Sequence, residues 1–295
     1  MENTKIRFLK ITLLILYLIN TCSCQPEKSQ MRGNDWRLFK DTKAWDFAKA
    51  VRNQETSSFE SLINEAILKI DFEEEIFGQS LLHLAVTNNL SISVKKLLEL
   101  GADPNHSNSR SGETVMHNAV GVFQDNDDTT ILKYLIENGG DLNGKILKIE
   151  DEIDNRDNKS VIYALCSNAY PQINKLKLLI KSGVSLEIKE GSMSNFLDAA
   201  IRTHNYKLVL LLLQSGVEYR KVIVTRFSGE KKFIQDCLKQ DLIDLESEAY
   251  QDKLKVINFL EKQGIDYRNT KPSDWLIQRA KQQMPDTWED YLSKF

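Results

Sequence analysis

Histidines are the first side chains of this 295-residue chain to consider for catalytic or metal chemistry. His83 and His117 occupy equivalent places in two similar segments, but neither has a Cys or a carboxylate at the spacing of metal ligands. His106 falls in an expected hairpin, and His204 falls at no motif position. The chain also lacks a G-x-S-x-G nucleophile elbow, a P-loop and a G-x-G-x-x-G motif. We therefore expect a protein that is not an enzyme and that holds no cofactor.

The run of acidic residues at Asp125, Asp127 and Asp128 has a superficial likeness to a calcium loop. It lacks the glycine at the sixth position and the closing glutamate that such a loop needs. A solvated insertion between two helices is the interpretation that these residues favour.

The N-terminus has the order of a secretory signal peptide. Basic residues at Lys5, Arg7 and Lys10 precede the apolar run ITLLILYLI at residues 11–19, and small residues follow at 21–24. The apolar run is shorter than the roughly 20 residues that a membrane-spanning helix needs. Residues 1–23 are therefore expected to be a signal peptide, followed by a polar linker at residues 24–41.

The cysteine at the end of this segment resembles that of a bacterial lipoprotein signal, in which the cysteine is acylated and becomes the new N-terminus. Cys24 after Ser23 fits best and Cys22 after Thr21 is the alternative, although both lack the usual leucine three positions earlier. Cleavage without acylation also stays open. The resemblance implies an exported protein, located in the periplasm or held at the membrane by its lipid anchor alone.

The remaining composition excludes two further classes. Cys166 and Cys237 are too few for a disulfide framework and are expected to be buried thiols. The chain has 39 basic and 42 acidic residues, and removing residues 1–23 makes it more acidic. Nucleic-acid binding needs a basic surface, so we expect no nucleic-acid partner.

One motif recurs along the chain. It opens with GQSLLHLAV at residues 78–86, continues with the apolar pair Leu97 and Leu98, and closes with GADPN at residues 101–105. A second copy opens with GETVMHNA at residues 112–119 and closes with LIENGGDLN at residues 135–143. The motif resembles the ankyrin repeat, which opens with G-x-T-P-L-H-x-A and has a period of about 33 residues.

Weaker copies keep the same frame around residues 160–183, 195–216 and 233–266, and a degenerate capping copy occupies residues 48–63. Gly183 and Gly216 are 33 residues apart, whereas Gly101 to Gly139 and Gly139 to Gly183 span 38 and 44. The middle units therefore carry insertions. The resemblance implies an all-α ankyrin-repeat solenoid of about five or six helix-turn-helix units with hairpin loops, over residues 42–269. Residues 270–295 are expected to form a C-terminal helical cap whose aromatic residues cover the last unit.

The residue types of the motif have physical roles. Alanines on the inner helix permit close approach of neighbouring helices, and the Leu pair faces inward from the outer helix. The following glycine can take a left-handed conformation and end that helix. In the family, the histidine is structural and bonds to loop backbone between units, which is the role expected for His83 and His117. Leu81 and Val115 stand where the family has proline.

The resemblance implies a face formed by hairpin loops and inner helices that binds a protein partner. The loop at residues 144–158 is unusually long, and its acidic side chains would steer a basic protein surface. The expected partner-binding residues in it are Glu150, Asp151, Glu152, Asp154 and Asp157. A solvated insertion without a binding role is the equal alternative. Arg110, in the shorter loop at residues 107–111, is the next candidate.

The sequence thus favours a monomeric, non-catalytic binding protein of the cell envelope. Its most specific version is an immunity or inhibitor protein that masks a toxin or a secreted enzyme. A structural adaptor that organises envelope proteins or protects against stress is the alternative, and an enzyme is the third.

The lipid anchor leads to a direct prediction. Cys24→Ala should release the protein from the membrane fraction, because a bacterial lipoprotein is held by its acylated cysteine. Immunoblots of fractionated cells check this. Persistent membrane association would contradict acylation at Cys24 and indicate Cys22 or an uncleaved apolar segment.

Overall fold

Six helix pairs follow one another along the chain in the computed structural model, which describes residues 27–121, 125–146, 159–189, 191–192, 195–240 and 242–294. No helix among these residues is both long and apolar enough to cross a membrane. The predicted all-α arrangement of five or six units is confirmed. The pairs are α2 (Trp45–Asn53) with α3 (Phe59–Ala66), α4 (Leu81–Thr87) with α5 (Ser91–Glu99), α6 (Val115–Val120) with α7 (Thr130–Glu137), α8 (Val161–Cys166) with α9 (Ile173–Lys181), α10 (Phe196–Arg202) with α11 (Tyr206–Gln214), and α12 (Ile234–Leu238) with α13 (Glu248–Lys262).

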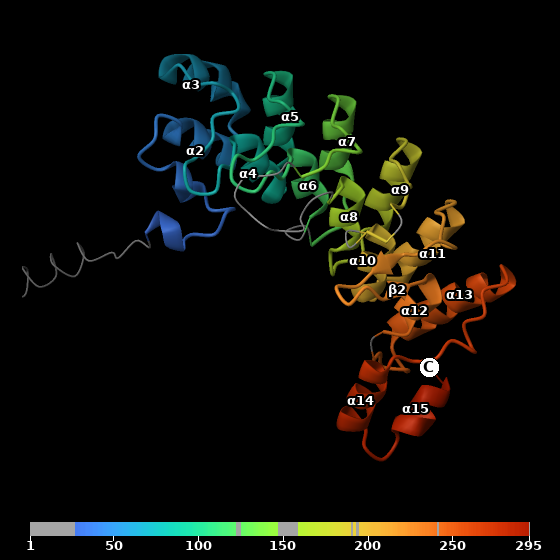
Figure 1. The fold of residues 1–295 in the computed structure, drawn as a ribbon. Helices are drawn as coiled ribbons and strands as arrows, with labels where there is room; N and C mark the ends of the chain where they lie inside the picture. The colour runs from blue at the N-terminus through green and yellow to red at the C-terminus, as the bar shows by residue number, and fades with distance from the viewer. Residues whose placement is uncertain are drawn as a thin grey trace, which may run out of the picture.

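The pairs stack into an arc that runs in chain order from α2 to α13 (Figure 1). The short inner helices α4, α6, α8, α10 and α12 contact one another in sequence, and outer helices do the same at α5–α7, α9–α11 and α11–α13. One continuous apolar core runs from Trp36 to Tyr291. Because each pair covers the apolar face of its neighbour, the units depend on stacking for their burial.

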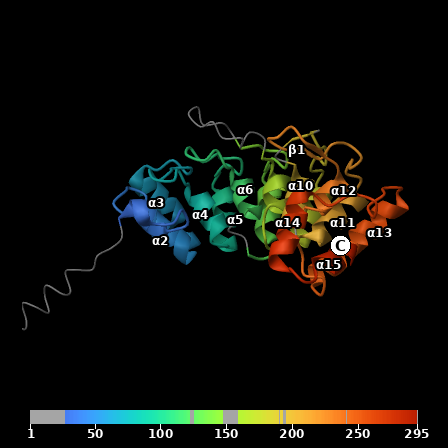
Figure 2. The same ribbon diagram turned by 60° about the horizontal axis from the view of Figure 1, so that its bottom comes forward.

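Loops join each outer helix to the next inner helix and lie along one edge of the array (Figure 2). The last of these loops contains the strands β1 (Val224–Thr225) and β2 (Lys231–Lys232), which pair antiparallel with Val224 opposite Lys232. Side-chain oxygens of Ser80, Ser160 and Asn195 accept backbone N–H groups in the first turns of α4, α8 and α10. The loops therefore end at residues that also start the inner helices.

The glycines that follow the outer helices have the predicted role. Gly101, Gly139, Gly183, Gly216 and Gly264 all have φ between +83° and +91°. At each of the five, a Cβ would meet no other heavy atom within 4 Å. Backbone conformation, and not lack of space, therefore explains why glycine stands at these positions.

The insertion between α6 and α7 has a structural role beyond the solvated loop that the sequence favoured. The Asp127 carboxylate accepts the backbone N–H groups of Asn174 and Lys175, at 2.8–2.9 Å and 3.0 Å, and so caps α9 of the next unit. Lys175 Nζ is buried and donates to the carbonyl of Ala119 at 3.0 Å. Burial lowers the pKa of Lys175 to about 8, against the raising effect of Asp127, Asp128 and Asp125.

Two further side chains of the unit formed by α8 and α9 reach the C-terminal end of α6. Gln172 Nε2 donates to the carbonyl of Val120 at 3.1 Å, and Asn168 Nδ2 donates to the carbonyl of Gly121 at 2.6 Å. Helix C-termini leave carbonyl groups without intrahelical partners. The neighbouring unit therefore supplies partners at the point where the insertion begins.

Both ends of the array differ from expectation. The 3-10 helix η2 (Trp36–Phe39) falls in the expected polar linker, yet Trp36, Leu38 and Phe39 are buried in the core. The linker assignment is wrong for these residues, because η2 packs on α2 and covers the first helix pair of the described part of the chain.

The C-terminal cap is confirmed, but it consists of two helices, α14 (Asp274–Gln283) and α15 (Trp288–Lys294), which lie together at the C-terminal end of the array (Figure 1). The Tyr291 hydroxyl accepts the N–H of Ile243 and donates to its carbonyl, both at 2.8 Å. Trp275 is 55% exposed and lies against the guanidinium of Arg279, so the expectation that it covers the last unit is wrong.

The glycine conformations lead to a stability prediction. Gly216→Ala should lower the free energy of unfolding by about 1–2 kcal/mol, because an L-residue at positive φ is strained. Gly33→Ala is the matched control: φ there is not in the left-handed region, and a Cβ would meet its nearest atom, in Phe77, at an ordinary 3.7 Å. Urea denaturation of both variants checks this, and equal losses would contradict it.

Candidate protein-binding face

We call the loops that lead into the inner helices fingers: the first is residues 69–80, the second 103–114, the third 141–160, the fourth 185–195 and the fifth 219–233. The first three each close on one antiparallel bridge, Glu73 with Ser80, Ser107 with Thr114, and Lys145 with Ser160. Each bridge ends at the residue that starts the inner helix, so the base of each finger is continuous with that helix.

In each of the first two fingers, one buried side chain accepts hydrogen bonds from backbone N–H groups of the tip. The Glu74 carboxylate accepts the N–H groups of Ile76, Phe77 and Gln79 at 2.8–3.2 Å. In the second finger, Asn108 Oδ1 accepts the N–H groups of Arg110 and Ser111 at 2.8 and 3.0 Å. These buried acceptors hold the tips in a single conformation.

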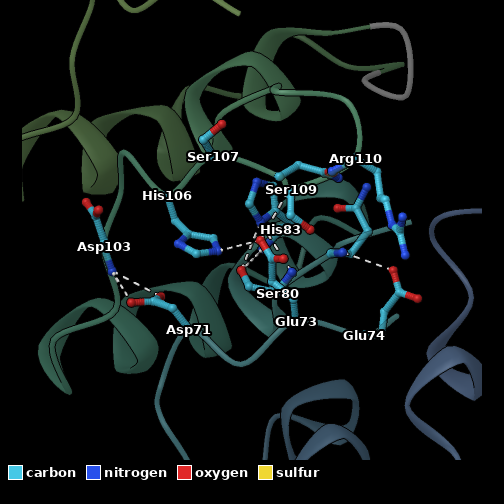
Figure 3. Close-up of polar contacts among 12 residues, drawn as sticks. Asp71, Glu73, Glu74, Ser80, His83, Asp103, His106, Ser107, Ser109 and Arg110 are labelled. Carbon is cyan, nitrogen blue, oxygen red and sulfur yellow. Dashed lines mark hydrogen bonds and ion pairs between the residues drawn. The ribbon is translucent and has the colours of Figure 1, made fainter. Parts of the chain in front are cut away.

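The first two fingers also bind each other (Figure 3). Glu73 Oε1 lies 2.9 Å from His106 Nε2 and accepts the N–H of Ser109 at 3.3 Å. Arg110, the predicted binding residue, donates from Nη2 to the carbonyl of Glu75 at 2.9 Å and remains exposed. The guanidinium of Arg110 thus joins two fingers, and its role in partner binding stays a prediction.

His83 and His117 are buried, in keeping with the expected structural role. His83 Nδ1 lies 2.9 Å from Ser80 Oγ, and His117 Nδ1 lies 2.8 Å from Thr114 Oγ1. Ser80 and Thr114 are the residues that precede the same two helices. His117 Nε2 lies 3.0 Å from the carbonyl of Lys159 in the next finger. Burial lowers the pKa of both: that of His83 falls to about 3, with the charge of His106 acting in the same direction.

Asp198 occupies the same place in α10 that His83 and His117 occupy in α4 and α6. Its carboxylate is 1% exposed and accepts a hydrogen bond of 2.9 Å from Arg202 Nε. Arg226 Nη2 lies 3.5 Å from the other carboxylate oxygen and also donates to Gln240 Oε1. Arg226 belongs to the fifth finger, so a buried carboxylate of an inner helix fixes the arginine at the tip of that finger.

Further bonds hold the fifth finger to its neighbours. Asn195 Nδ2 donates to the carbonyl of Ile223 at 2.8 Å, and Gly191 and Thr225 join the fourth and fifth fingers through a backbone bond of 3.1 Å. A Cβ at Gly191 would lie 2.7 Å from Thr225 Oγ1, so the two fingers approach closely there. The base of the fifth finger is therefore fixed on both sides.

Phe227 stands at the tip of this fixed finger and is 85% exposed. The tip closes through the bond from Gly229 N to the carbonyl of Arg226 at 2.8 Å, with Gly229 at φ +82°. Aromatic residues are enriched at the centres of protein interfaces, and a rigid tip loses little entropy on binding. Sequence reasoning missed this residue, although VIVT followed by Ser-Gly at residues 222–229 is a hairpin signal.

A hollow of about 360 Å3 opens between the third and fourth fingers. Its lining combines the apolar side chains of Ile162, Ile188 and Phe196 with the charged residues Lys145, Glu187 and Lys189. Apolar surface with a few charged groups suits a protein or peptide segment.

The other predicted site residues lie outside the described residues: Glu150, Asp151, Glu152, Asp154, Asp157 and Cys24. Cys166 and Cys237 are confirmed as buried free thiols, and burial raises the pKa of both. Within the described part of the chain, no three His, Cys, Asp or Glu side chains are placed to hold a metal ion.

Comparison with known proteins agrees with this geometry. Residues 47–146 match the family model described as ankyrin repeats (three copies). Among solved structures, the chain is similar to the ankyrin repeat domain of Bcl-3, described as a unique member of the IkappaB protein family, with a TM-score of 0.52 and 20% identity over 76% of this chain and 90% of that one. No curated protein matches the chain.

The fold is therefore an ankyrin-repeat solenoid, and the repeats indicate a protein-interaction module. The matched residues end at 146, so the later units are assigned by their structure.

The buried histidines lead to a pH prediction. The unfolded chain binds a proton at His83 near pH 6.5, whereas the folded chain does so only near pH 3, so stability is lost as pH falls below about 6.5. His83→Gln should be less stable than wild type at neutral pH, and this difference should shrink by about 2 kcal/mol between about pH 7.5 and pH 5. Denaturation curves across this range check it, and a constant difference would contradict the lowered pKa, because it would mean that His83 binds its proton equally readily in the folded and unfolded chains.

Proposed function

We propose that this protein is exported, anchored at the membrane through Cys24, and binds one specific protein partner through its fingers. In its most specific form it is an immunity or inhibitor protein that masks a toxin or a secreted enzyme. The observation that carries the binding proposal is Phe227, an almost fully exposed aromatic side chain on a finger that neighbouring elements hold rigidly.

The cost of this exposure supports a binding role. A phenylalanine side chain gains about 1.5–3 kcal/mol from burial, and this gain is not realised in the isolated chain. Several independent contacts, including Arg226 with Asp198 and Asn195 with Ile223, nevertheless fix the tip that presents it. A partner with an apolar pocket would bury Phe227 without first having to order the finger.

The charges of the fingers give the partner a further character. The fifth finger has five basic residues and one acidic residue, whereas residues 150–157 of the third finger are acidic in sequence. A partner that contacts both fingers would present an acidic rim around the pocket for Phe227 and a basic area for the third finger.

The opposite charges of the two fingers also favour a second candidate function. Each finger could bind a different protein, and the chain would then be a structural adaptor that brings envelope proteins together. The number of partners distinguishes this function from inhibition of a single one.

The test begins with the chain from Gln25 onward as bait against an extract of its source. With the captured partner purified, Phe227→Ser should weaken binding by about thirtyfold, as for an interface hot spot of about 2 kcal/mol, with the melting temperature unchanged. Changing Glu150, Asp151, Glu152 and Asp154 to Ser should weaken binding more at low salt than at high salt.

Ile92→Ser is the matched control, because Ile92 is 58% exposed on the outer helix α5, away from the fingers. Unchanged affinity for Phe227→Ser would refute the role of the fifth finger. One stoichiometric partner that loses enzymatic or toxic activity when bound supports the inhibitor. Several partners bound through different fingers support the adaptor instead.

A further inference from the structure

The N-terminal end of the array has a hollow of about 600 Å3 that neither the core nor the fingers account for. It opens beside η1 (Lys28–Gln30), η2 and α2, and three arginines line it together with Asp35: Arg32, Arg37 and Arg52. Three guanidinium groups around one hollow favour an anionic ligand, because the planar guanidinium fork matches phosphate oxygens.

The arrangement of charges leaves the hollow positive. Asp35 forms a bidentate pair with Arg37, with Nη2 to Oδ2 at 2.6 Å and Nε to Oδ1 at 3.0 Å. This pair holds the pKa of Asp35 below its usual range, so the carboxylate offsets one of the three arginine charges. Arg32 and Arg52 are both exposed, and their charges face solvent at the hollow.

The N-terminal segment is basic as a whole. Residues 27–53, which include the three arginines and Asp35, contain seven lysines and arginines against four acidic residues, in a chain whose formal net charge is -3. A basic end on an acidic protein is a local feature with its own electrostatic field.

We propose that this N-terminal end docks on the anionic phospholipid headgroups of the membrane, with phosphates in the hollow. The orientation rests on the proposed lipid attachment at Cys24. Arg32 is eight residues from Cys24, and eight residues span at most about 29 Å when fully extended. The basic end would therefore be the part of the folded chain nearest to the membrane, with the fingers further along the array.

Electrostatic docking would add to the anchor. Basic residues next to a membrane anchor are attracted by the negative potential of an anionic leaflet, which makes membrane binding more favourable. This attraction falls off within a Debye length. Docking through Arg32, Arg37 and Arg52 would also fix the direction in which the array, and hence Phe227, extends from the surface.

Flotation with lipid vesicles tests the surface without the anchor. The chain from Gln25 onward lacks Cys24 and contains every residue that the structure describes. It should bind vesicles of phosphatidylcholine with phosphatidylglycerol and not vesicles of phosphatidylcholine alone, and high salt should weaken the binding. Arg32→Ser/Arg52→Ser should reduce the affinity by about thirtyfold, as expected for two basic residues at a membrane surface.

Lys181→Ser/Lys262→Ser is the matched control, since it removes two exposed positive charges from the ends of α9 and α13 and leaves the Asp35–Arg37 pair intact in both variants. Unchanged melting curves show that each variant is folded. The proposal would be overturned if the two double variants bound anionic vesicles equally well. It would also be overturned if the wild-type chain bound vesicles of phosphatidylcholine alone as well as vesicles that contain phosphatidylglycerol.

Calorimetry with inorganic phosphate distinguishes a site for lipid headgroup phosphates from a site for a soluble phosphate. Saturable phosphate binding without vesicle binding would make the hollow a site for a soluble phosphate and would overturn the membrane proposal. Both double variants should bind the protein partner as tightly as the wild-type chain does. If the wild-type chain binds the vesicles but captures no partner, the proposed function is refuted and the membrane proposal is not.

Discussion

Burial of apolar surface between neighbouring helix pairs is the interaction on which every other feature of this protein depends. Polar bonds cross the same junctions: Ser93 Oγ donates to the carbonyl of Val51 at 2.6 Å, and Thr203 Oγ1 to the carbonyl of Cys166 at 3.2 Å. Because a unit is complete only when its neighbour is present, the two ends of the array need other covers. The buried residues of η2 supply one, and α14 with α15 supplies the other.

The same dependence explains how the array tolerates irregular units. The insertion begins after α6, and side chains of the next unit bind carbonyl groups at the end of that helix. Burial of the Lys175 ammonium is unfavourable in free energy, and the aspartates of the insertion offset part of this effect. The acidic run is therefore part of the junction between two units.

Local residue patterns were sufficient to predict the repeating part of the fold. Gly183 and Gly216 marked the helix ends because the left-handed conformation is a property of one residue, and Leu97 with Leu98 marked the buried face of α5. The binding face depended on contacts distant in sequence. Asp198 and Arg226 are 28 residues apart, and no local pattern indicates that they meet. This contact fixes Arg226, the residue next to Phe227 at the finger tip, so the sequence alone did not reveal how the tip is held.

The third position of the inner helices differs from unit to unit: His83 and His117 are followed by Tyr163, Asp198 and Asp236. The side chains seen at this position meet different partners, since His117 contacts the Lys159 carbonyl and Asp198 binds Arg226. The repeats have therefore lost the interchangeability that tandem duplication first gives to copies of one sequence. A recombination event that exchanged the second and fifth helix pairs would separate the buried Asp198 carboxylate from Arg226. Selection on this gene should accordingly preserve the order of the repeats as well as their number.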